Sequence, residues 1–338
     1  MMRKLIYIIL GCVLFFPACH KKQDGSKAVV IGLSVPSETD ERWVRDIYVL
    51  KRKVSELGAE LYVSSGDSNA ALQMSRSLQM LKAVKPSVLI IASQDREIGM
   101  QMSAKAHEAG AKVIAYEWLL PGKDVDFYLS FDYLGIGRKQ ARYLNKVVNG
   151  GNYVFFYGAE DDNNYKFMKQ GAMEILKPLA ESGHINLIAD KEVSDWNADD
   201  AARKADSVLK DYSDDVQAFL VSDDVAAGGV ITALAWHGLA GKVPVTGESS
   251  SLAAVQRVAR GTQLLTIFKD SQLLASTAVD AAVSMSVGGT PPSNTQVNNG
   301  TKDVPALLLD TVIIDKGNIN LLVQSGYLTA KQIYGKEI

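Results

Sequence analysis

Cysteine is scarce in this sequence, and where it occurs it cannot cross-link the main body. The only two, Cys12 and Cys19, both lie within the first 19 residues. The body of the protein therefore has no disulfide and no thiolate metal site. The four histidines are scattered along the chain and do not suggest a metal site either. We expect no metal and no cofactor.

An excess of one charge sign is also missing. The 36 basic residues nearly balance the 38 acidic ones, giving a net charge of −2, which argues against a nucleic-acid partner. The 338 residues are 47% hydrophobic and 22% charged, values typical of globular proteins and too apolar for disorder. The length suits one large domain or two ordinary ones.

Catalytic motifs are missing as well. No Ser-His-Asp or Cys-His arrangement falls on predicted strand ends. Gly135 and Gly137 resemble a phosphate-binding loop only weakly, because the third glycine and the acidic partner are absent. Asp223 and Asp224 could in principle act as an acid–base pair, but neighbouring side chains at a helix start point in different directions. We interpret the chain as a binding protein rather than an enzyme.

The first residues have the pattern of an export signal. Arg3 and Lys4 precede an apolar run over residues 5–16, which is too short to span a bilayer comfortably. The run ends in "FPAC", which resembles a bacterial lipobox and implies cleavage before Cys19 and lipidation of its thiol. A plain secretory signal is the alternative. We expect a signal peptide over 1–18 and a lipid-anchored polar tether over 19–27.

The remaining chain alternates between strand and helix patterns. Apolar runs, typical of strands covered on both faces, alternate with helical patterns that often end in glycine. The expected strands are 28–35, 59–65, 87–93, 111–116 and 126–132, then 151–158, 185–193, 216–222, 243–248 and 263–269. This order predicts an α/β protein with two doubly wound parallel-sheet lobes.

Polar and aromatic residues gather after the expected strands, where ligands bind in open parallel sheets. Sugars need this mixture, because hydroxyls bond to planar polar groups while ring C–H faces pack on flat aromatics. The strand-tip residues are Glu41, Arg42, Trp43, Glu117, Trp118, Asp162, Asn163, Asn164, Trp196, Asp223, Asp224, Glu248, Ser249 and Lys269. Trp236 instead lies within an expected helix beside Leu234 and is interpreted as packing.

Several stretches carry a family resemblance over nearly the whole mature chain. They include "ERW", "QMSRSLQML", "DVDFYLSFD", "DDNNYK", "GLAGKVPVTG", "RVARGTQLLTIFK" and "NNGTKDVPALLL". The chain resembles bacterial periplasmic sugar-binding proteins of ABC transporters, in the ribose/galactose/xylose group and nearest its xylose branch. The resemblance implies a type I periplasmic binding fold, in which two lobes joined by a three-strand hinge close on the ligand.

The resemblance also implies lobe boundaries. We expect residues 28–132 and 271–292 in the first lobe, and 133–270 and 293–338 in the second. The crossings fall near 132–133, 269–271 and 291–294, and the segment 304–315 is expected to return to the second lobe.

Site residues follow from the same resemblance. The expected sugar-binding set is Arg42, Trp43, Glu117, Trp118, Asn163, Asn164, Trp196, Asp224, Glu248, Ser249 and Lys269. Two positions depart from the family pattern: Glu117–Trp118 stands where relatives have Asp-Arg, and Ser249 stands where an Asp is usual. The loss of the guanidinium fork and of that carboxylate affects which sugar fits. We expect a xylose-like pentose or a related monosaccharide.

The function implied is that of a monomeric, lipid-anchored binding protein of the periplasm or cell envelope. It would capture a monosaccharide and deliver it to an ABC permease. The alternative is a sugar-sensing subunit that signals to a membrane sensor kinase.

Overall fold

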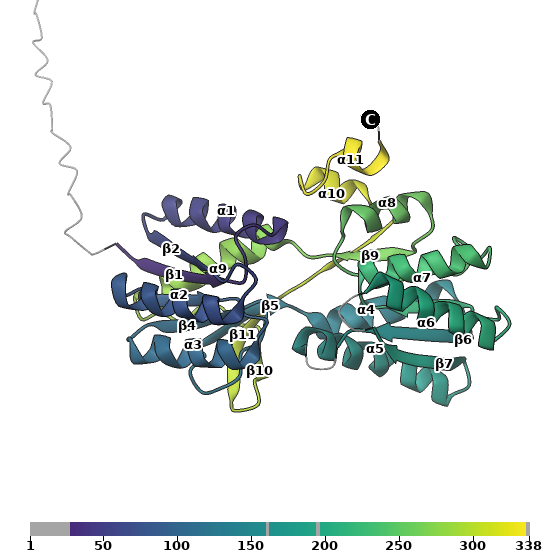
Figure 1. The fold of residues 1–338 in the computed structure, drawn as a ribbon, viewed down its shortest axis with the longest axis horizontal. Helices are drawn as coiled ribbons and strands as arrows, with labels where there is room; N and C mark the ends of the chain where they lie inside the picture. Colours follow the sequence, from purple (N-terminus) through teal and green to yellow (C-terminus); the bar gives the residue numbers. More distant parts are fainter. Residues whose placement is uncertain (1–27, 160–161, 194–196, 336–338) are drawn as a thin grey trace, which may run out of the picture.

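A computed structural model describes residues 28–159, 162–193 and 197–335. Its helices and strands form two lobes that lie side by side, each with a central sheet (Figure 1). The expected signal peptide, Cys19 and the tether fall outside the described residues, as does Trp196.

The first lobe is built on a seven-stranded sheet. The strand order is β10-β11-β5-β4-β3-β1-β2, and all neighbours are parallel except β10 and β11. The strands are β1 (Val30–Val35), β2 (Glu60–Ser65), β3 (Val88–Ile91), β4 (Lys112–Tyr116), β5 (Phe127–Phe131), β10 (Thr295–Asn298) and β11 (Asp303–Leu309). The four apolar residues of β3 are all buried, as expected for a central parallel strand.

Helices cover both faces of this sheet. They are α1 (Glu41–Glu56), α2 (Ala70–Ala83), α3 (Arg96–Glu108) and α9 (Ser271–Ser286). The helix pair α1 and α9 packs over one face and the pair α2 and α3 over the other. Each face therefore has its own hydrophobic core, which holds the strand ends in fixed positions.

The second lobe repeats this plan with a smaller sheet. Its strands are β6 (Gly151–Tyr157), β7 (Ile185–Glu192), β8 (Ala218–Val221), β9 (Leu265–Phe268) and β12 (Val312–Asp315). They form the order β7-β6-β8 and the antiparallel pair β12-β9. Residues 243–248, which we expected to be a strand, make only a single bridge, between Val245 and Phe219. The backbone N–H of Leu264 also donates to the carbonyl of Val245, so this segment links the two groups of strands.

Seven helices surround these strands. They are α4 (Tyr133–Val147), α5 (Asn163–Glu181), α6 (Ala198–Asp211), α7 (Asp224–Trp236), α8 (Leu252–Arg260), α10 (Asn320–Gln324) and α11 (Ala330–Tyr334). Helices α4 and α5 pack together, as do α6 and α7, and each pair has its own buried cluster. Helices α10 and α11 lie beside α8 at the top of the lobe (Figure 1).

The chain crosses between the lobes three times, and the third crossing differs from our expectation. The whole segment 304–315 was expected to belong to the second lobe. It contains two strands instead: β11 pairs with β5 in the first lobe, and β12 pairs with β9 in the second. The crossing therefore lies at 310–311 and not at 291–294, and residues 295–309 belong to the first lobe.

The physical reason is a hairpin that the apolar pattern alone does not reveal. Gly300 adopts a φ of +89° in the turn, which lets β10 and β11 pair in antiparallel register. Val304 and Ala306 are then fully buried in the first-lobe core. β10 is an edge strand of the sheet and contains few apolar residues.

Two further observations concern the exposure of Trp236 and the absence of a membrane-spanning helix among the described residues. Trp236 was expected to pack, but the residue is 63% exposed at the end of α7, so that interpretation was wrong. The buried face of α7 is carried by smaller residues such as Ala226, Val230 and Leu234. Across the ranges that the structure describes, no helix combines the length and the apolar character needed to cross a membrane.

Candidate functional site

A cavity of about 220 Å³ lies between the lobes at the carboxyl ends of the strands. Both lobes contribute to its wall, so its shape depends on how they sit together. The lining residues are Arg42, Gln94, Glu117, Trp118, Tyr133, Asp162, Asn164, Tyr165, Asp223, Glu248, Ser249 and Lys269. This volume is below the usual range for drug-sized ligands and suits one small polar molecule.

A larger groove of about 510 Å³ lies beside β10, α4 and α5. Its lining is mostly apolar and amide side chains, with Asp132 as the one charged residue. We place the candidate site in the smaller cavity, because buried charged groups from both lobes converge there.

Glu117 occupies a strained position at the tip of β4. Its φ is +69°, a region that non-glycine residues adopt only at a cost of about 1–3 kcal/mol. Three hydrogen bonds hold it there. Its N–H donates to the carbonyl of Leu129 at 2.9 Å, and its own carbonyl accepts from Ser130 Oγ at 2.7 Å and Tyr128 Oη at 3.2 Å. The left-handed backbone turns the Glu117 side chain into the cavity wall.

The Glu117 carboxylate is buried and paired on both oxygens. Arg42 Nη1 lies 3.1 Å from Oε1, and Arg42 Nη2 lies 3.0 Å from Oε2. The hydroxyl of Tyr133 also donates to Oε1. Burial alone raises the pKa of Glu117, but Arg42 and Lys269 more than offset this and hold the pKa at about 2. Glu117 is therefore a fixed negative charge at neutral pH.

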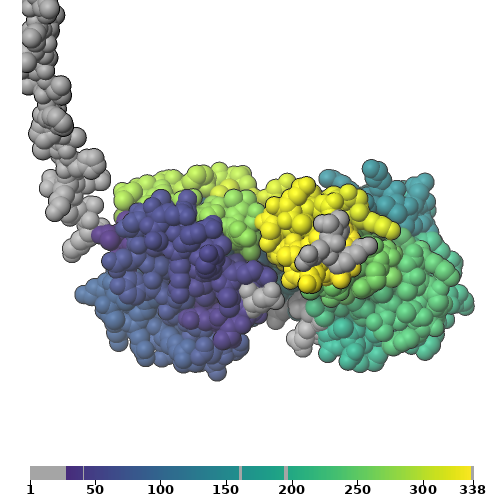
Figure 2. Space-filling view, turned by 90° about the horizontal axis from the view of Figure 1, so that it is seen from above, coloured from purple at the N-terminus to yellow at the C-terminus, as the bar shows by residue number. Residues whose placement is uncertain are grey.

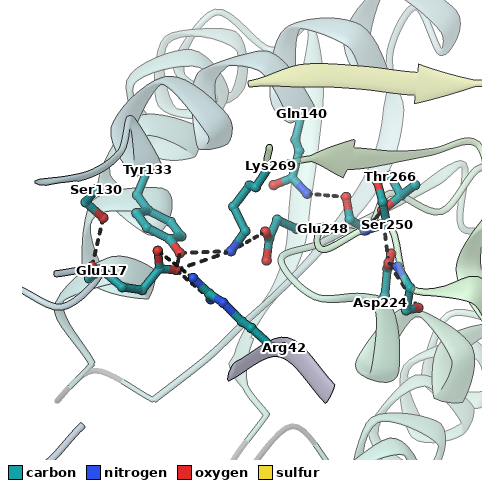
Figure 3. A network of polar contacts seen from close by, with 12 residues as sticks. Arg42, Glu117, Ser130, Tyr133, Gln140, Asp224, Glu248, Ser250, Thr266 and Lys269 are labelled. Carbon is teal, nitrogen blue, oxygen red and sulfur yellow. Dashed lines mark hydrogen bonds and ion pairs between the residues drawn. The ribbon is translucent and has the colours of Figure 1, made fainter. Parts of the chain in front are cut away.

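Lys269 joins the two lobes electrostatically (Figure 3). Its Nζ lies 2.8 Å from Glu248 Oε1 and 3.7 Å from Glu117 Oε1, and it donates to Tyr133 Oη at 2.9 Å. Burial disfavours the charge on Lys269, but Glu248 and Glu117 raise its pKa above the ordinary value. Burial raises the pKa of Glu248 despite the nearby ammonium group of Lys269.

The second-lobe wall carries groups with hydrogen-bonding capacity left over. Asp223 caps α7, accepting from the N–H groups of Val225 and Ala226 at 2.6 and 3.0 Å through Oδ1. Burial raises the pKa of Asp223 to about 6, with Glu248 adding to the effect. Asn164 is 3% exposed, and no donor among the described residues reaches its Oδ1. A buried acceptor of this kind in a cavity wall points to a donor on a bound molecule.

Seven of the eleven predicted site residues line the cavity. They are Arg42, Glu117, Trp118, Asn164, Glu248, Ser249 and Lys269. Ser249 also has a positive φ of 111°, so the loop after Val245 is strained where it meets the cavity. Trp196 lies outside the described residues.

Three predicted residues stand elsewhere, each for a physical reason. Asp224 lies behind the wall, where its oxygens accept from Gln263, Ser251 and Thr266, and Figure 3 shows it directed away from Lys269. Trp43 is 5% exposed and packs in the first-lobe core, with its ring 5.8 Å from that of Trp118. Asn163 bonds to Arg96 of the first lobe instead of lining the cavity.

Five cavity residues were not in the predicted set. Asp162 and Asp223 belong to the strand-tip residues of the sequence, but the resemblance selected their neighbours. Tyr133 lies at the first predicted crossing and Tyr165 directly follows Asn164, so their place at or beside a predicted feature was their only signal. Gln94 follows β3 and carried no signal beyond its place after a strand. Within the described ranges, no group of three or more His, Cys, Asp and Glu side chains could hold a metal ion.

Comparisons with known proteins concern the family and the fold of the chain. The model of a periplasmic binding protein domain matches residues 31–290. The chain is 36% identical over 324 residues to the D-xylose-binding periplasmic protein of Escherichia coli, covering 96% of both chains. It is 33% identical over 349 residues to the multiple sugar-binding periplasmic receptor ChvE of Rhizobium radiobacter, again covering 96% of each.

A solved structure has the same overall fold. An ABC transporter solute-binding protein of Clostridium phytofermentans, with bound β-D-glucose, superposes with a TM-score of 0.77 at 28% identity. The alignment covers 90% of this chain and 99% of that one.

Proposed function

The chain belongs to the periplasmic binding protein domain family, and we propose that it captures a neutral monosaccharide between its lobes for delivery to an ABC permease. A xylose-like pentose or a related sugar is the proposed ligand. The observation that carries the proposal is the cavity of about 220 Å³, into which both lobes direct ion-paired polar groups and the indole of Trp118. Named relatives bind D-xylose or glucose, and the cavity chemistry suits molecules of that kind.

The chemistry of the wall matches a polyhydroxylated ligand. Sugar hydroxyls can donate to Glu117, Asp223 and the free Oδ1 of Asn164, and can accept from Arg42. Trp118 is half-buried and offers an apolar face for ring C–H groups. Recognition is thus spread over both lobes, so binding favours the closed arrangement.

The charge balance favours a neutral sugar. The lining holds four carboxyl groups, on Asp162, Glu117, Asp223 and Glu248, against the two cations Arg42 and Lys269. Both cations already pair with Glu117 or Glu248. An anionic sugar would add a charge of the sign already in excess, which is unfavourable in a buried site.

A thermal-shift screen tests the proposal. We expect D-xylose, D-glucose or a closely related neutral sugar to raise the unfolding midpoint, because ligand at a hundredfold excess over Kd stabilises by about 2.7 kcal/mol. D-glucuronate serves as the anionic control and should give a smaller shift or none. If no pentose, hexose or polyol moves the midpoint, sugar binding is wrong.

We further propose that Cys19 carries a lipid anchor that holds the protein at the membrane surface. The proposal rests on the short apolar run, the following "FPAC" and the polar stretch after it. Cys19→Ser should move the protein from the membrane fraction to the soluble fraction and abolish labelling by radioactive palmitate. Cys12→Ser is the matched control and should leave both unchanged. Retention of labelled, membrane-bound protein after Cys19→Ser would contradict the anchor.

A further inference from the structure

Side chains also bridge the lobes outside the sugar cavity, and two of these contacts join α3 or α1 of the first lobe to the second lobe. The first joins α3 to the start of α5, where Arg96 Nη1 donates to Asn163 Oδ1 at 2.7 Å. The amide nitrogen of Asn163 also donates to the carbonyl of Leu119 at 3.3 Å, just beyond β4. Asn163 thus holds the second lobe to two separate segments of the first.

The second contact joins α1 to the segment between α10 and α11. The guanidinium carbon of Arg45 lies 5.4 Å from the ring centroid of Tyr327, a cation–π distance. The same ring packs at 5.0 Å against Phe268 of β9, which fixes it to the second lobe. Seen from above, the C-terminal segment in yellow meets the first lobe in purple near the waist of the molecule (Figure 2).

Neither contact can recognise a ligand directly. Arg45, Arg96, Asn163 and Tyr327 are all absent from the cavity lining, whereas Asn164 beside them is part of it. Both contacts do depend on how close the lobes are, because each joins side chains on opposite sides of the hinge. A rotation that opens the cleft separates Arg96 from Asn163 and breaks the hydrogen bond.

We propose that these two lobe-bridging contacts set the balance between open and closed forms, and thereby set the affinity for every ligand by the same factor. When only the closed form binds tightly, the apparent Kd equals the intrinsic Kd divided by the closed fraction of the protein. A contact present only in the closed form raises that fraction before any ligand arrives. This inference rests on the proposed sugar-binding function, but the contacts act on the ligand-free protein too.

Arg96→Ala is the principal test. We expect it to raise the Kd values for D-xylose and D-glucose by one common factor, about three- to tenfold, measured by calorimetry. In the ligand-free protein, small-angle X-ray scattering should show a larger radius of gyration than in the wild type. Tyr327→Leu, which removes the aromatic face but keeps an apolar side chain, should act in the same direction by a smaller factor.

Arg76→Ala is the matched control. Arg76 is also a partly exposed arginine, and it bonds at 2.7 Å to Asp67 within the first lobe. Its loss should change neither the Kd values nor the radius of gyration.

A double-mutant cycle adds a sharper criterion. Because Arg96 and Asn163 act through one another, Arg96→Ala combined with Asn163→Ala should weaken binding little more than either change alone. Arg96→Ala combined with Tyr327→Leu should instead multiply the two single effects.

Three results would overturn the inference. Unequal factors for the two sugars would assign Arg96 to ligand recognition, and a radius of gyration unchanged from the wild type would show that the contact does not hold the lobes together. If Arg96→Ala and Arg76→Ala changed the Kd values and the radius of gyration equally, the contact of Arg96 would likewise not hold the lobes together. If no sugar binds the wild type, the proposed function fails, while scattering from the ligand-free variants still decides whether the contacts control closure.

Discussion

Replacing Glu117 by glutamine is expected to lower the free energy of unfolding by about 3 kcal/mol at pH 7 and to weaken sugar binding at least tenfold. The substitution keeps the size of the side chain but removes the charge that faces Arg42. Breaking a buried ion pair on one side is strongly destabilising, because the other charge stays behind without compensation. Arg42 keeps a side-chain exposure of 28%, which places the effect at the lower end of the range for such pairs.

The same substitution should flatten the acid limb of the stability curve. The pKa of Glu117 is lowered to about 2 in the folded protein, so its contribution is fully present above its unfolded pKa near 4.5. That contribution disappears as the pH falls from about 4.5 through 2. Urea unfolding from pH 7 down to pH 3 should therefore show wild type and Glu117→Gln converging at low pH.

Glu174→Gln is the matched control for this prediction. Glu174 also pairs with an arginine, Arg138, but on the exposed surface of the second lobe. Exposed pairs contribute about 0–1 kcal/mol, so this variant should unfold like the wild type and bind sugar unchanged. Equal losses in Glu117→Gln and Glu174→Gln would contradict the central role given to Glu117.

Replacing Lys269 by methionine is expected to lower both the free energy of unfolding and the affinity for sugar. The methionine fills a similar space, but Glu248 loses its ammonium partner 2.8 Å away while staying 1% exposed. We expect a loss of about 2–4 kcal/mol of unfolding free energy at pH 7. Sugar affinity should fall too, because Lys269 also holds Tyr133 and Glu117 in place.

This loss should shrink as the pH falls, as the loss for Glu117→Gln does, but over a higher pH range, above the unfolded pKa of a glutamate. Burial already raises the pKa of Glu248, and removal of Lys269 raises it further. A carboxyl group with a raised folded pKa opposes folding increasingly as the pH rises above its unfolded pKa. The deficit of Lys269→Met relative to wild type should therefore be smaller at pH 5 than at pH 7.

The control for Lys269 is Lys210→Met on α6. Lys210 lies 2.7 Å from Asp206 but is 67% exposed, so its replacement should have little effect at either pH. A deficit in Lys269→Met that does not change between pH 5 and pH 7 would show that Glu248 does not stay charged and buried as described.

Much of the fold could be predicted from the sequence, because buried parallel strands are continuous apolar runs. The run "SVLIIAS" predicts a buried strand, and it contains β3, whose four residues are all buried. The last two strands could not be separated in this way. Residues 304–314 are apolar except near Asp310 and Thr311, and this short polar link divides them between sheets in different lobes. An apolar pattern predicts that residues are buried, but it does not predict in which of the two lobes they are buried.

The sequence could predict which strand ends form the candidate site, but not which of two adjacent side chains faces the cavity. Glu117, Glu248 and Lys269 follow strands and line the cavity, as the rule for open sheets implies. At the start of α7, the position of the helix cap decides which aspartate lines the cavity. Asp223 has the capping conformation and lines the cavity, while Asp224 is one residue into the helix and turns back to Gln263 and Thr266.

The same one-residue alternation separates Asn163 from Asn164 at the start of α5. Asn164 is buried in the cavity wall, whereas Asn163 reaches across to Arg96. Adjacent helical residues lie about 100° apart around the axis, so a strand-tip rule cannot choose between them.

The most direct measurement is a crystal structure of the protein grown with the neutral sugar that gives the largest thermal shift. We predict one monosaccharide between the lobes, with hydroxyls bonded to Asn164 Oδ1 and Asp223 and with a ring face against Trp118. The contacts of Arg96 with Asn163 and of Lys269 with Glu248 should be intact in that structure. A sugar bound elsewhere, for example in the groove beside β10, or a cleft that stays empty at saturating sugar, would contradict the proposed site.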